Sequence, residues 1–242
     1  MRRKYKGRGI VLGTVKYGDS SLVAQLLTDV GGRQSYMVQG VRSSRGRGSK
    51  LALFQPLFAL EFEGVEPSRG ELHRFGEVRS GITLGKTPFD VRRSTIALFM
   101  AEVLYRLIKE SEANEPLFDF VWGCVEALDR IDEGVANFHL WFLSNLSRFL
   151  GFSPANNYSK GSYFDIKEGC YTLEKPSHTS IMQADNALIL RDMIECDVRH
   201  LGEIGLNRHQ RVSFLEALMQ YYGYHLESIH SVRSISILME LF

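Results

Sequence analysis

The sequence predicts an α+β protein in which a small β-domain precedes a mainly helical domain. Residues 9–79 contain short runs of Val, Ile and Leu that alternate with polar residues and stop at glycine turns. Residues 90–241 instead repeat apolar residues at three- and four-residue spacings. The chain has 242 residues, a length that favours two domains over one. We therefore expect domains at 1–80 and 81–242.

The β-domain is expected to contain five strands. Gly31-Gly32 predicts a tight reversal, because both glycines can adopt positive φ. Pro56 predicts that the fourth strand is bulged or lies at an edge. Five short strands in about eighty residues fit a sandwich or a small closed barrel, of which the OB-fold is the common form. The expected strands are 9–17, 20–29, 33–39, 51–63 and 71–79.

The second domain is expected to be helical with one small β-insertion. Thr87-Pro88 is a good helix entry, and Gly151 is a good helix stop. The apolar stripes are typical of a helix-bundle core. A short hairpin at about 162–174, turning at 167–169, interrupts the helical pattern. The expected helices are 90–110, 115–131, 134–150, 182–195, 208–222 and 231–241.

Charge is distributed unevenly along the chain. The overall formal charge is only +1. Residues 1–50 hold 11 Lys/Arg against 2 Asp/Glu, a net charge of +9, whereas the rest holds 18 against 26, a net charge of −8. This asymmetry predicts that the N-terminal part faces a polyanion and that the remainder does something else.

The most basic stretch is 40–50, which contains no acidic residue. Its glycines loosen the backbone, and its cations repel one another unless an anion lies among them. We interpret it as a flexible loop that wraps a phosphate backbone; a solvated loop without a ligand is the alternative. Its cations are Arg42, Arg45, Arg47 and Lys50.

Two further groups are candidates for nucleic-acid contact. Cations at the start of the chain predict a basic arm, or else a plain disordered terminus. Three tyrosines are candidates for stacking on bases, with ordinary barrel packing as the alternative. The first group is Arg2, Arg3, Lys4, Lys6 and Arg8, and the second is Tyr5, Tyr17 and Tyr36.

No catalytic constellation is evident, so we expect a protein that is not an enzyme and needs no cofactor or metal. There is no HExxH, no Gly-x-Ser-x-Gly and no Cys-x-x-Cys. Glu61 and Glu63 share one predicted strand face and suggest a Mg²⁺-dependent nuclease, but solvated carboxylates are far more common in such positions. Three distant cysteines, with no leader pattern and no long apolar run, indicate a cytoplasmic protein.

Several stretches, taken in order, resemble the RecO family of bacterial recombination mediators. The N-terminal ones are Gly9-Ile-Val-Leu-Gly-Thr-Val-Lys-Tyr-Gly-Asp-Ser-Ser-Leu22, Leu27-Thr-Asp-Val-Gly-Gly-Arg33, Gly40-Val-Arg-Ser-Ser-Arg45, Leu53-Phe-Gln-Pro-Leu57 and Glu71-Leu-His73. The later ones are Ala101-Glu-Val-Leu104, Leu117-Phe118, Phe142-Leu-Ser-Asn-Leu-Ser-Arg-Phe-Leu-Gly-Phe-Ser-Pro154, Tyr221-Tyr-Gly-Tyr-His-Leu226 and Ser231-Val-Arg-Ser234.

The resemblance implies an OB-fold followed by a helical domain, with no turnover chemistry. Family members bind single- and double-stranded DNA, anneal complementary strands and pair with RecR. They also interact with the single-strand-binding protein and help to load the RecA recombinase, which implies a cytoplasmic, nucleoid-associated protein. The implied DNA surface includes Lys16, Arg33, Arg42, Arg45, Arg47 and Lys50, and with the residues named above it completes the expected site.

An adaptor role for the helical domain is the alternative function. The resemblance implies that the acidic, hydrophobic tail of the single-strand-binding protein is its ligand. Arginines could receive the carboxylates of that tail, although surface solvation is the simpler role for most of them. The candidates are Arg92, Arg93, Arg106, Arg208 and Arg211.

The chain departs from the family at one place. Many members carry a four-cysteine zinc site after the Leu-Gly-x-x-Pro signature, whereas here Ala155–Ser162 follows without a cysteine, and Cys170 comes later as an isolated cysteine. Because four ligands close a structural zinc site, we expect no zinc. Packing of side chains must then hold the hairpin, and the expected ones are Tyr163, Phe164, Ile166, Tyr171 and Leu173.

Overall fold

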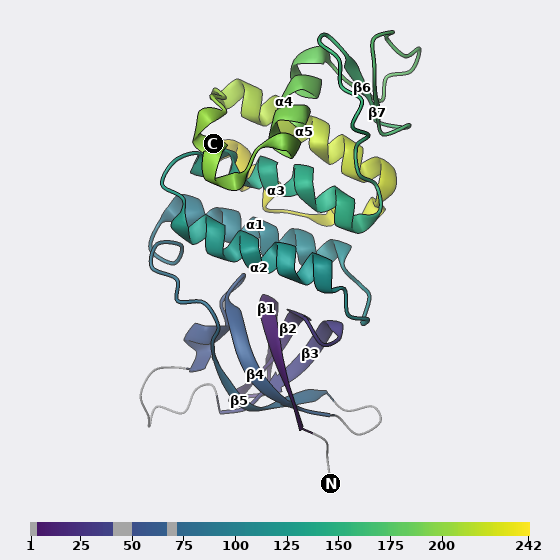
Figure 1. Ribbon diagram of the computed structural model, residues 1–242. Coiled ribbons are helices and arrows are strands. Elements are labelled where there is room, and N and C mark those ends of the chain that lie inside the picture. The colour runs from purple at the N-terminus through teal and green to yellow at the C-terminus, as the bar shows by residue number, and fades with distance from the viewer. Residues whose placement is uncertain (1–3, 41–49, 67–71) are drawn as a thin grey trace. The chain divides into compact units, whose positions relative to one another are not determined.

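The computed structural model of the chain describes residues 4–40, 50–66 and 72–242 (Figure 1). It divides into two compact units. The first unit contains Met1–Asp90 and Met100–Asp129, and the second contains Val91–Phe99 and Arg130–Phe242. The expected boundary at residue 80 separates strands from helices, whereas the first compact unit also contains helical residues.

Within the described residues, five strands of the first unit close into a barrel in the order β1-β2-β3-β5-β4. The long strand β1 closes it, because Lys4–Ile10 pair with β4 and Gly9–Tyr17 pair with β2. The predicted α+β class and five-stranded barrel are confirmed. The strands are β1 (Lys4–Tyr17), β2 (Ser21–Thr28), β3 (Gly32–Val38), β4 (Ala59–Val65) and β5 (His73–Ser80).

The prediction of a strand over 51–63 is wrong in its first half. Lys50–Phe54 form a 3₁₀ helix, η1, and the Phe54 ring is buried in the barrel core. Pro56 has no N–H to donate, and Leu57 has a φ of 66°, so the chain turns before β4 begins. The core that Phe54 joins consists of Val11, Leu22, Ala24, Leu26, Tyr36, Val38, Leu60 and Phe62.

The start of β1 also differs from the prediction. The strand begins at Lys4, not at residue 9, so Lys4, Lys6 and Arg8 belong to the barrel and not to a basic arm. In this part of β1, inward and outward residues alternate as in any strand. Two of the inward positions are occupied by Gly7 and Gly9, so the sequence lacks the apolar residues by which the strand could have been predicted.

Two long helices follow the barrel, α1 (Val91–Leu107) and α2 (Glu115–Arg130). The end of α2 anchors the segment that connects β5 to α1. The carboxylate of Asp129 accepts hydrogen bonds from the backbone N–H groups of Gly85, Lys86 and Thr87 at 2.7–2.9 Å. Burial opposes ionisation, but these N–H donors lower the pKa of Asp129.

The second unit packs helices around α3 and adds a small sheet of order β7-β6-β8. The predicted continuous helix over 134–150 is instead α-helical only in the middle, and its last turn tightens into a 3₁₀ turn that ends at Gly151, with a φ of 88°. The elements are η2 (Val135–Asn137), α3 (Phe138–Leu146), η3 (Ser147–Leu150), β6 (Tyr163–Asp165), β7 (Cys170–Thr172), β8 (Ile181–Met182), α4 (Ala184–Glu195), η4 (Val198–Glu203), α5 (Arg208–His225), η5 (Glu227–Ser231) and α6 (Ile235–Leu241).

The predicted hairpin is present as β6 and β7, and β8 is a third strand that was not predicted. Phe164 and Ile166 are fully buried and Tyr171 nearly so, whereas Leu173 is 66% exposed and contributes no packing of the kind expected. Asn157 fixes the preceding loop to β7, because its side-chain amide exchanges two 2.9 Å hydrogen bonds with the backbone of Tyr171.

Candidate nucleic-acid interface

The strand register divides the outside of the barrel into two faces. Neighbouring residues on a strand point to opposite sides, and directly paired residues point to the same side. Because Leu22, Ala24, Tyr36 and Val38 are buried inside, the residues between them point outward. One face is formed by β2, β3 and the adjoining ends of β1 and β5; the other is formed by β4, the first half of β1 and the rest of β5.

We call the first of these the β2–β3 face. A row of paired residues crosses it from β1 to β5: Val15 pairs with Val23, Val23 with Met37, and Met37 with Arg74. Tyr17 continues the outward side of β1, and Val15 and Tyr17 are 60% and 57% exposed. This face therefore presents an apolar and aromatic strip with a cation at one end.

Lys16 lies beside the β2–β3 face, at the end of β1. It pairs with Leu22, which in turn pairs with Val38, so it points to the inner side of the barrel wall, where the strand end leaves it exposed. Lys16 and Arg74 are both exposed, and neither forms an ion pair within the described part of the chain. The turn between β1 and β2 adjoins the same end of the strand.

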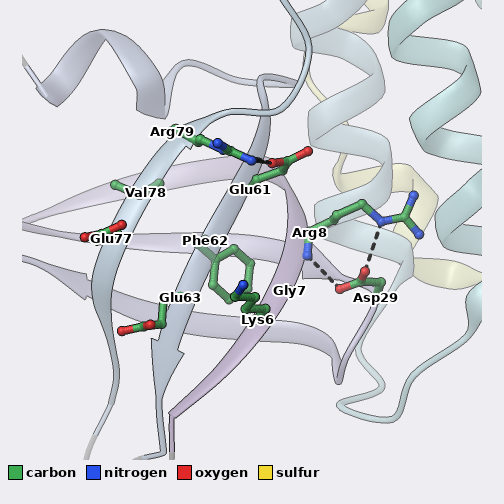
Figure 2. Close-up of a pocket in the computed structure, with 10 residues that line it drawn as sticks. All are labelled: Lys6, Gly7, Arg8, Asp29, Glu61, Phe62, Glu63, Glu77, Val78 and Arg79. Atoms are coloured by element: carbon green, nitrogen blue, oxygen red, sulfur yellow. Dashed lines mark hydrogen bonds and ion pairs between the residues drawn. The ribbon is translucent and has the colours of Figure 1, made fainter.

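The β4–β5 face has a different chemistry (Figure 2). Its cations alternate with carboxylates around a shallow hollow of about 480 Å³. The Lys4 ammonium lies 2.8 Å from the Glu63 carboxylate, and Arg79 donates to Glu61 through Nε at 2.9 Å. The outward residues of this face are Lys4, Lys6, Arg8, Glu61, Glu63, Glu77 and Arg79.

Arg8 is engaged within the first unit. It donates to Asp29 through its backbone N–H at 2.8 Å and through Nε at 3.0 Å, and to Asp119 of α2 through Nη2 at 3.2 Å. Its guanidinium carbon lies 4.9 Å from the centre of the Phe118 ring. Burial opposes the charge, but the two carboxylates raise the pKa of Arg8.

Arg33 holds the end of α1. Its Nη1 donates to the carbonyl oxygens of Tyr105 at 2.8 Å and Ile108 at 3.0 Å, and its backbone N–H donates to Glu110 at 3.0 Å. An arginine is well suited to the unpaired carbonyls at a helix C-terminus. Arg33 therefore makes a structural contact, and the DNA contact that the resemblance implied stays a prediction.

The expectation that Tyr36 stacks on a base does not fit its placement. The side chain is fully buried, and its ring stacks on Phe75 with 4.6 Å between centroids. Its hydroxyl donates to Gln34 Oε1 at 2.8 Å and lies 2.9 Å from the hydroxyl of Tyr5, which also lies 2.8 Å from His73 Nδ1. Tyr5 and Tyr36 thus belong to the barrel interior, and Tyr17 is the exposed member of the three.

Several predicted residues lie outside the described part of the chain, namely Arg2, Arg3, Arg42, Arg45 and Arg47, and the side chain of Lys50 is likewise not described. Their assignment to DNA contact stays a prediction. Sequence reasoning missed Arg74, Val23 and Met37. Alternation along each strand shows which way they point, but it does not show that β3 and β5 are neighbours, and that pairing unites them in one face.

The acidic pair proposed for a nuclease lies on the β4–β5 face with cationic partners. Glu61 is bound by Arg79, and Glu63 is bound by Lys4. In the ranges that the structure describes, no three His, Cys, Asp or Glu side chains gather as a metal site would require. The two carboxylates are thus placed as members of ion pairs.

The arginines considered for an acidic tail are mostly bound to backbone carbonyls of their own unit. Arg93 donates to Ile131, and Arg208 donates to Met239 at 3.0 Å. Arg211 donates through Nε to Phe242 at 3.1 Å, and burial together with nearby Arg92 lowers the pKa of its guanidinium. Arg106, in the first unit, lies against the Tyr105 ring.

Comparison with known proteins covers nearly the whole chain. A family model described as "Recombination protein O N terminal" matches residues 1–80, and one described as "Recombination protein O C terminal" matches residues 88–233. Along the described ranges, no helix has the length and apolar content that crossing a membrane requires.

Curated relatives give the same result. Proteins named "DNA repair protein RecO" from Bacteroides fragilis and Phocaeicola vulgatus are 38% and 34% identical, each over 97% of both chains. One from Flavobacterium psychrophilum is 33% identical over 98% of both. By the match of both family models and by these identities, the chain belongs to the RecO family.

Proposed function

We propose that this chain binds single-stranded DNA through the β2–β3 face of its barrel and acts in DNA repair as a non-enzymatic recombination mediator. Membership of the RecO family supports a role in DNA repair and recombination. The observation that carries the proposed site is the contrast between the two barrel faces: Arg74 on the β2–β3 face and Lys16 beside it have no ion-pair partner among the described residues, whereas Lys4, Arg8 and Arg79 opposite do. OB-type barrels use the face of strands 2 and 3 for oligonucleotides.

Two kinds of contact act together on this face. Tyr17 offers an aromatic ring on which a base stacks without regard to sequence, and Val23 and Met37 extend the apolar surface beside it. Lys16 and Arg74 bind phosphates, and the predicted loop cations Arg42, Arg45, Arg47 and Lys50 add to them. Neutralising roughly 4–6 phosphates of a single strand gives a log–log salt slope of about −3 to −4.

Strand annealing follows from the same electrostatics. When cations neutralise the phosphates of two complementary strands at once, the repulsion that keeps the strands apart falls. In this proposal the protein pairs with a RecR-like partner, contacts the acidic tail of the single-strand-binding protein, and helps RecA to load onto the exposed strand. No catalytic group is required at any step.

The first experiment measures binding of a fluorescent single-stranded oligonucleotide across a salt series, for wild type and for the Arg42→Ala/Arg45→Ala/Arg47→Ala variant. We expect a steep slope for wild type, and weaker binding with a flatter slope for the variant. Equal affinity in both would remove the loop from the site. Affinity that does not depend on salt would overturn the electrostatic mechanism.

Annealing of two labelled complementary strands is then followed with the same two proteins. Incubation of labelled DNA with Mg²⁺ serves as the control for enzymatic action, and we expect intact strands. Cleavage that disappears in Glu61→Gln/Glu63→Gln would contradict a purely non-enzymatic mediator.

A further inference from the structure

The second unit contains a groove that the DNA-binding proposal does not use. It lies along α4 and is completed by η4 and by the residues that lead into α5, with a volume of about 650 Å³. Its apolar part consists of Leu188 and Ile189 from α4 and Ile204 and Leu206 from the opposite wall. Leu188 is 38% exposed, so apolar surface remains open in the groove.

Carboxylates surround this apolar part. They are Asp185, Asp192 and Glu195 on α4, and Asp197 and Glu203 on the other wall. His200 lines the groove as well and lies 2.7 Å from Glu203, but no lysine or arginine is among the residues that the structure places along it. From outside the groove, Arg191 pairs with Asp192 and Glu195, and Arg199 pairs with Asp197. The five carboxylates thus outnumber the two arginines beside them.

The thiol of Cys196 lies among these carboxylates. Burial raises its pKa, and the nearby carboxylates of Asp197, Glu203 and Asp192 raise it further. The carboxylates of the lining make a further negative charge in this place unfavourable. Nucleic acid and acidic peptides are repelled by such a surface, whereas a cationic group is attracted.

The spacing of the groove residues along α4 indicates which kind of ligand the groove can bind. Asp185, Leu188 and Asp192 follow one another at intervals of three and four residues and so share one side of the helix. With a rise of 1.5 Å per residue, the two carboxylates are about 10 Å apart along the helix axis, with the leucine between them. A ligand that matches this side has two cations about 10 Å apart and an apolar group between them.

We propose that this groove binds a basic peptide segment of a protein partner, with Lys or Arg side chains facing the carboxylates and an apolar side chain seated against Leu188. The partner is a protein because the complementary ligand carries cations and apolar groups on one backbone. A metal ion is a poorer match, because no three potential ligands gather among the described residues. The site lies entirely in the second unit and does not depend on the DNA-binding face.

The test uses a fluorescein-labelled peptide of three Lys-Leu-Leu-Lys repeats and measures its anisotropy against the full chain. Two control peptides replace every lysine with glutamate or every leucine with serine. We expect binding of the first peptide, no binding of the glutamate peptide, and clearly weaker binding of the serine peptide. Binding of the glutamate peptide as tightly as the lysine peptide would overturn the proposal.

Matched variants separate the groove from general charge attraction. The groove variant Asp185→Asn/Glu195→Gln/Glu203→Gln and the control variant Glu168→Gln/Glu216→Gln/Glu227→Gln each lose three exposed carboxylates of the same unit. Three exposed ion pairs contribute about 1.4 kcal/mol together, or about tenfold in affinity. We expect that loss for the groove variant and less than about twofold for the control. Equal losses in both variants would show that the groove is not the site.

Cys196 gives a second measurement on folded protein. In a Cys170→Ser background, Cys196 is the more accessible of the remaining thiols, because Cys124 is buried. We expect the lysine peptide to slow alkylation of Cys196 by iodoacetamide, and to lose this effect in the groove variant. An alkylation rate that the bound peptide leaves unchanged would place the peptide elsewhere and overturn the proposal.

Discussion

The two faces of the barrel contain cations of the same kinds in different surroundings. On the β4–β5 face, Lys4 and Arg79 each have a carboxylate partner within 3 Å. Arg74 on the β2–β3 face and Lys16 beside it have no such partner among the described residues. Lys16 lies between exposed Val15 and Tyr17 on β1, and Arg74 lies at the other end of the row of paired residues. The two sides thus differ in the ionic partners of their cations more than in the number of those cations.

At the turn between β2 and β3, the partners of a cation are backbone carbonyl groups of the protein and not carboxylates. Gly32 has a φ of 57°, and a Cβ atom on it would lie 2.3 Å from the carbonyl oxygen of Glu112. Arg33 next to it binds the end of α1. The turn and the helix end therefore form one structural contact within the first unit.

Gly32→Ala should have the largest effect on this contact. Positive φ disfavours alanine, and the carbonyl groups of Glu110 and Glu112 cannot move away cheaply because they are backbone atoms. We expect the free energy of unfolding to fall by about 3 kcal/mol. Urea denaturation checks this, with Gly18→Ala as control: Gly18 also has positive φ but open space at the Cβ position. Equal losses for the two would show that the close approach is unimportant.

Arg33→Ala should have the next largest effect. It leaves the carbonyls of Tyr105 and Ile108 without their charged donor, and we expect a loss of about 2 kcal/mol in unfolding free energy. The salt slope of DNA binding, measured on the folded variant, should stay as in wild type. A flatter slope with unchanged stability would instead return Arg33 to the DNA-binding residues.

Removing two cations from each side in turn tests the comparison directly. Lys16→Ala/Arg74→Ala removes two cations without ion-pair partners among the described residues, and Lys4→Ala/Arg79→Ala removes two ion-paired cations of the β4–β5 face. We expect the first variant to lose about tenfold in affinity for single-stranded DNA at moderate salt, with a slope smaller by about 1.4. The second should lose much less. Similar losses would mean that DNA senses only the total charge.

Tyr17→Ala should have a smaller effect on DNA binding. The exposed ring stacks on a base in the proposed complex, and its loss should cost about 1 kcal/mol, or roughly fivefold in affinity, at every salt concentration. Tyr17→Phe keeps the stacking surface and should bind like wild type. If the phenylalanine variant is as weak as the alanine variant, the hydroxyl and not the ring makes the contact.

The sequence predicts those parts of the fold and of the candidate site that depend on residues close together in the chain. Alternation and glycine turns predicted β2 and β3, because these signals lie within a few residues. The number of strands left a sandwich and a closed barrel open, and the family resemblance implied the barrel. The η1 helix was missed because burial of Phe54 in the barrel overrode the apolar, strand-like pattern around it. Tyr36 could not be placed for a similar reason: an aromatic residue on a strand fits an exposed stacking site and a packed interior equally well until its neighbours are known.

The roles of the cations were harder to predict, because a charge does not indicate its partner. Arg33 lies 72 residues before Tyr105, and Lys4 lies 59 residues before Glu63. Only the three-dimensional fold brings these pairs together. Arg74 lacked any local feature that distinguished it from other surface arginines, and it belongs to the β2–β3 face because β3 and β5 pair in parallel.

Removing carboxylates from the β4–β5 face should have the smallest effect on DNA binding. Glu61→Gln/Glu63→Gln/Glu77→Gln releases Lys4 and Arg79 from their ion pairs and leaves the β2–β3 face untouched. Because exposed pairs contribute little, we expect stability to change by less than about 1 kcal/mol. If ion pairing is what keeps DNA off this face, affinity for single-stranded DNA should rise about two- to threefold at low salt, and the gain should disappear at high salt. Unchanged affinity at low salt would mean that shape and aromatic contacts, not the balance of charge, select the face that DNA uses.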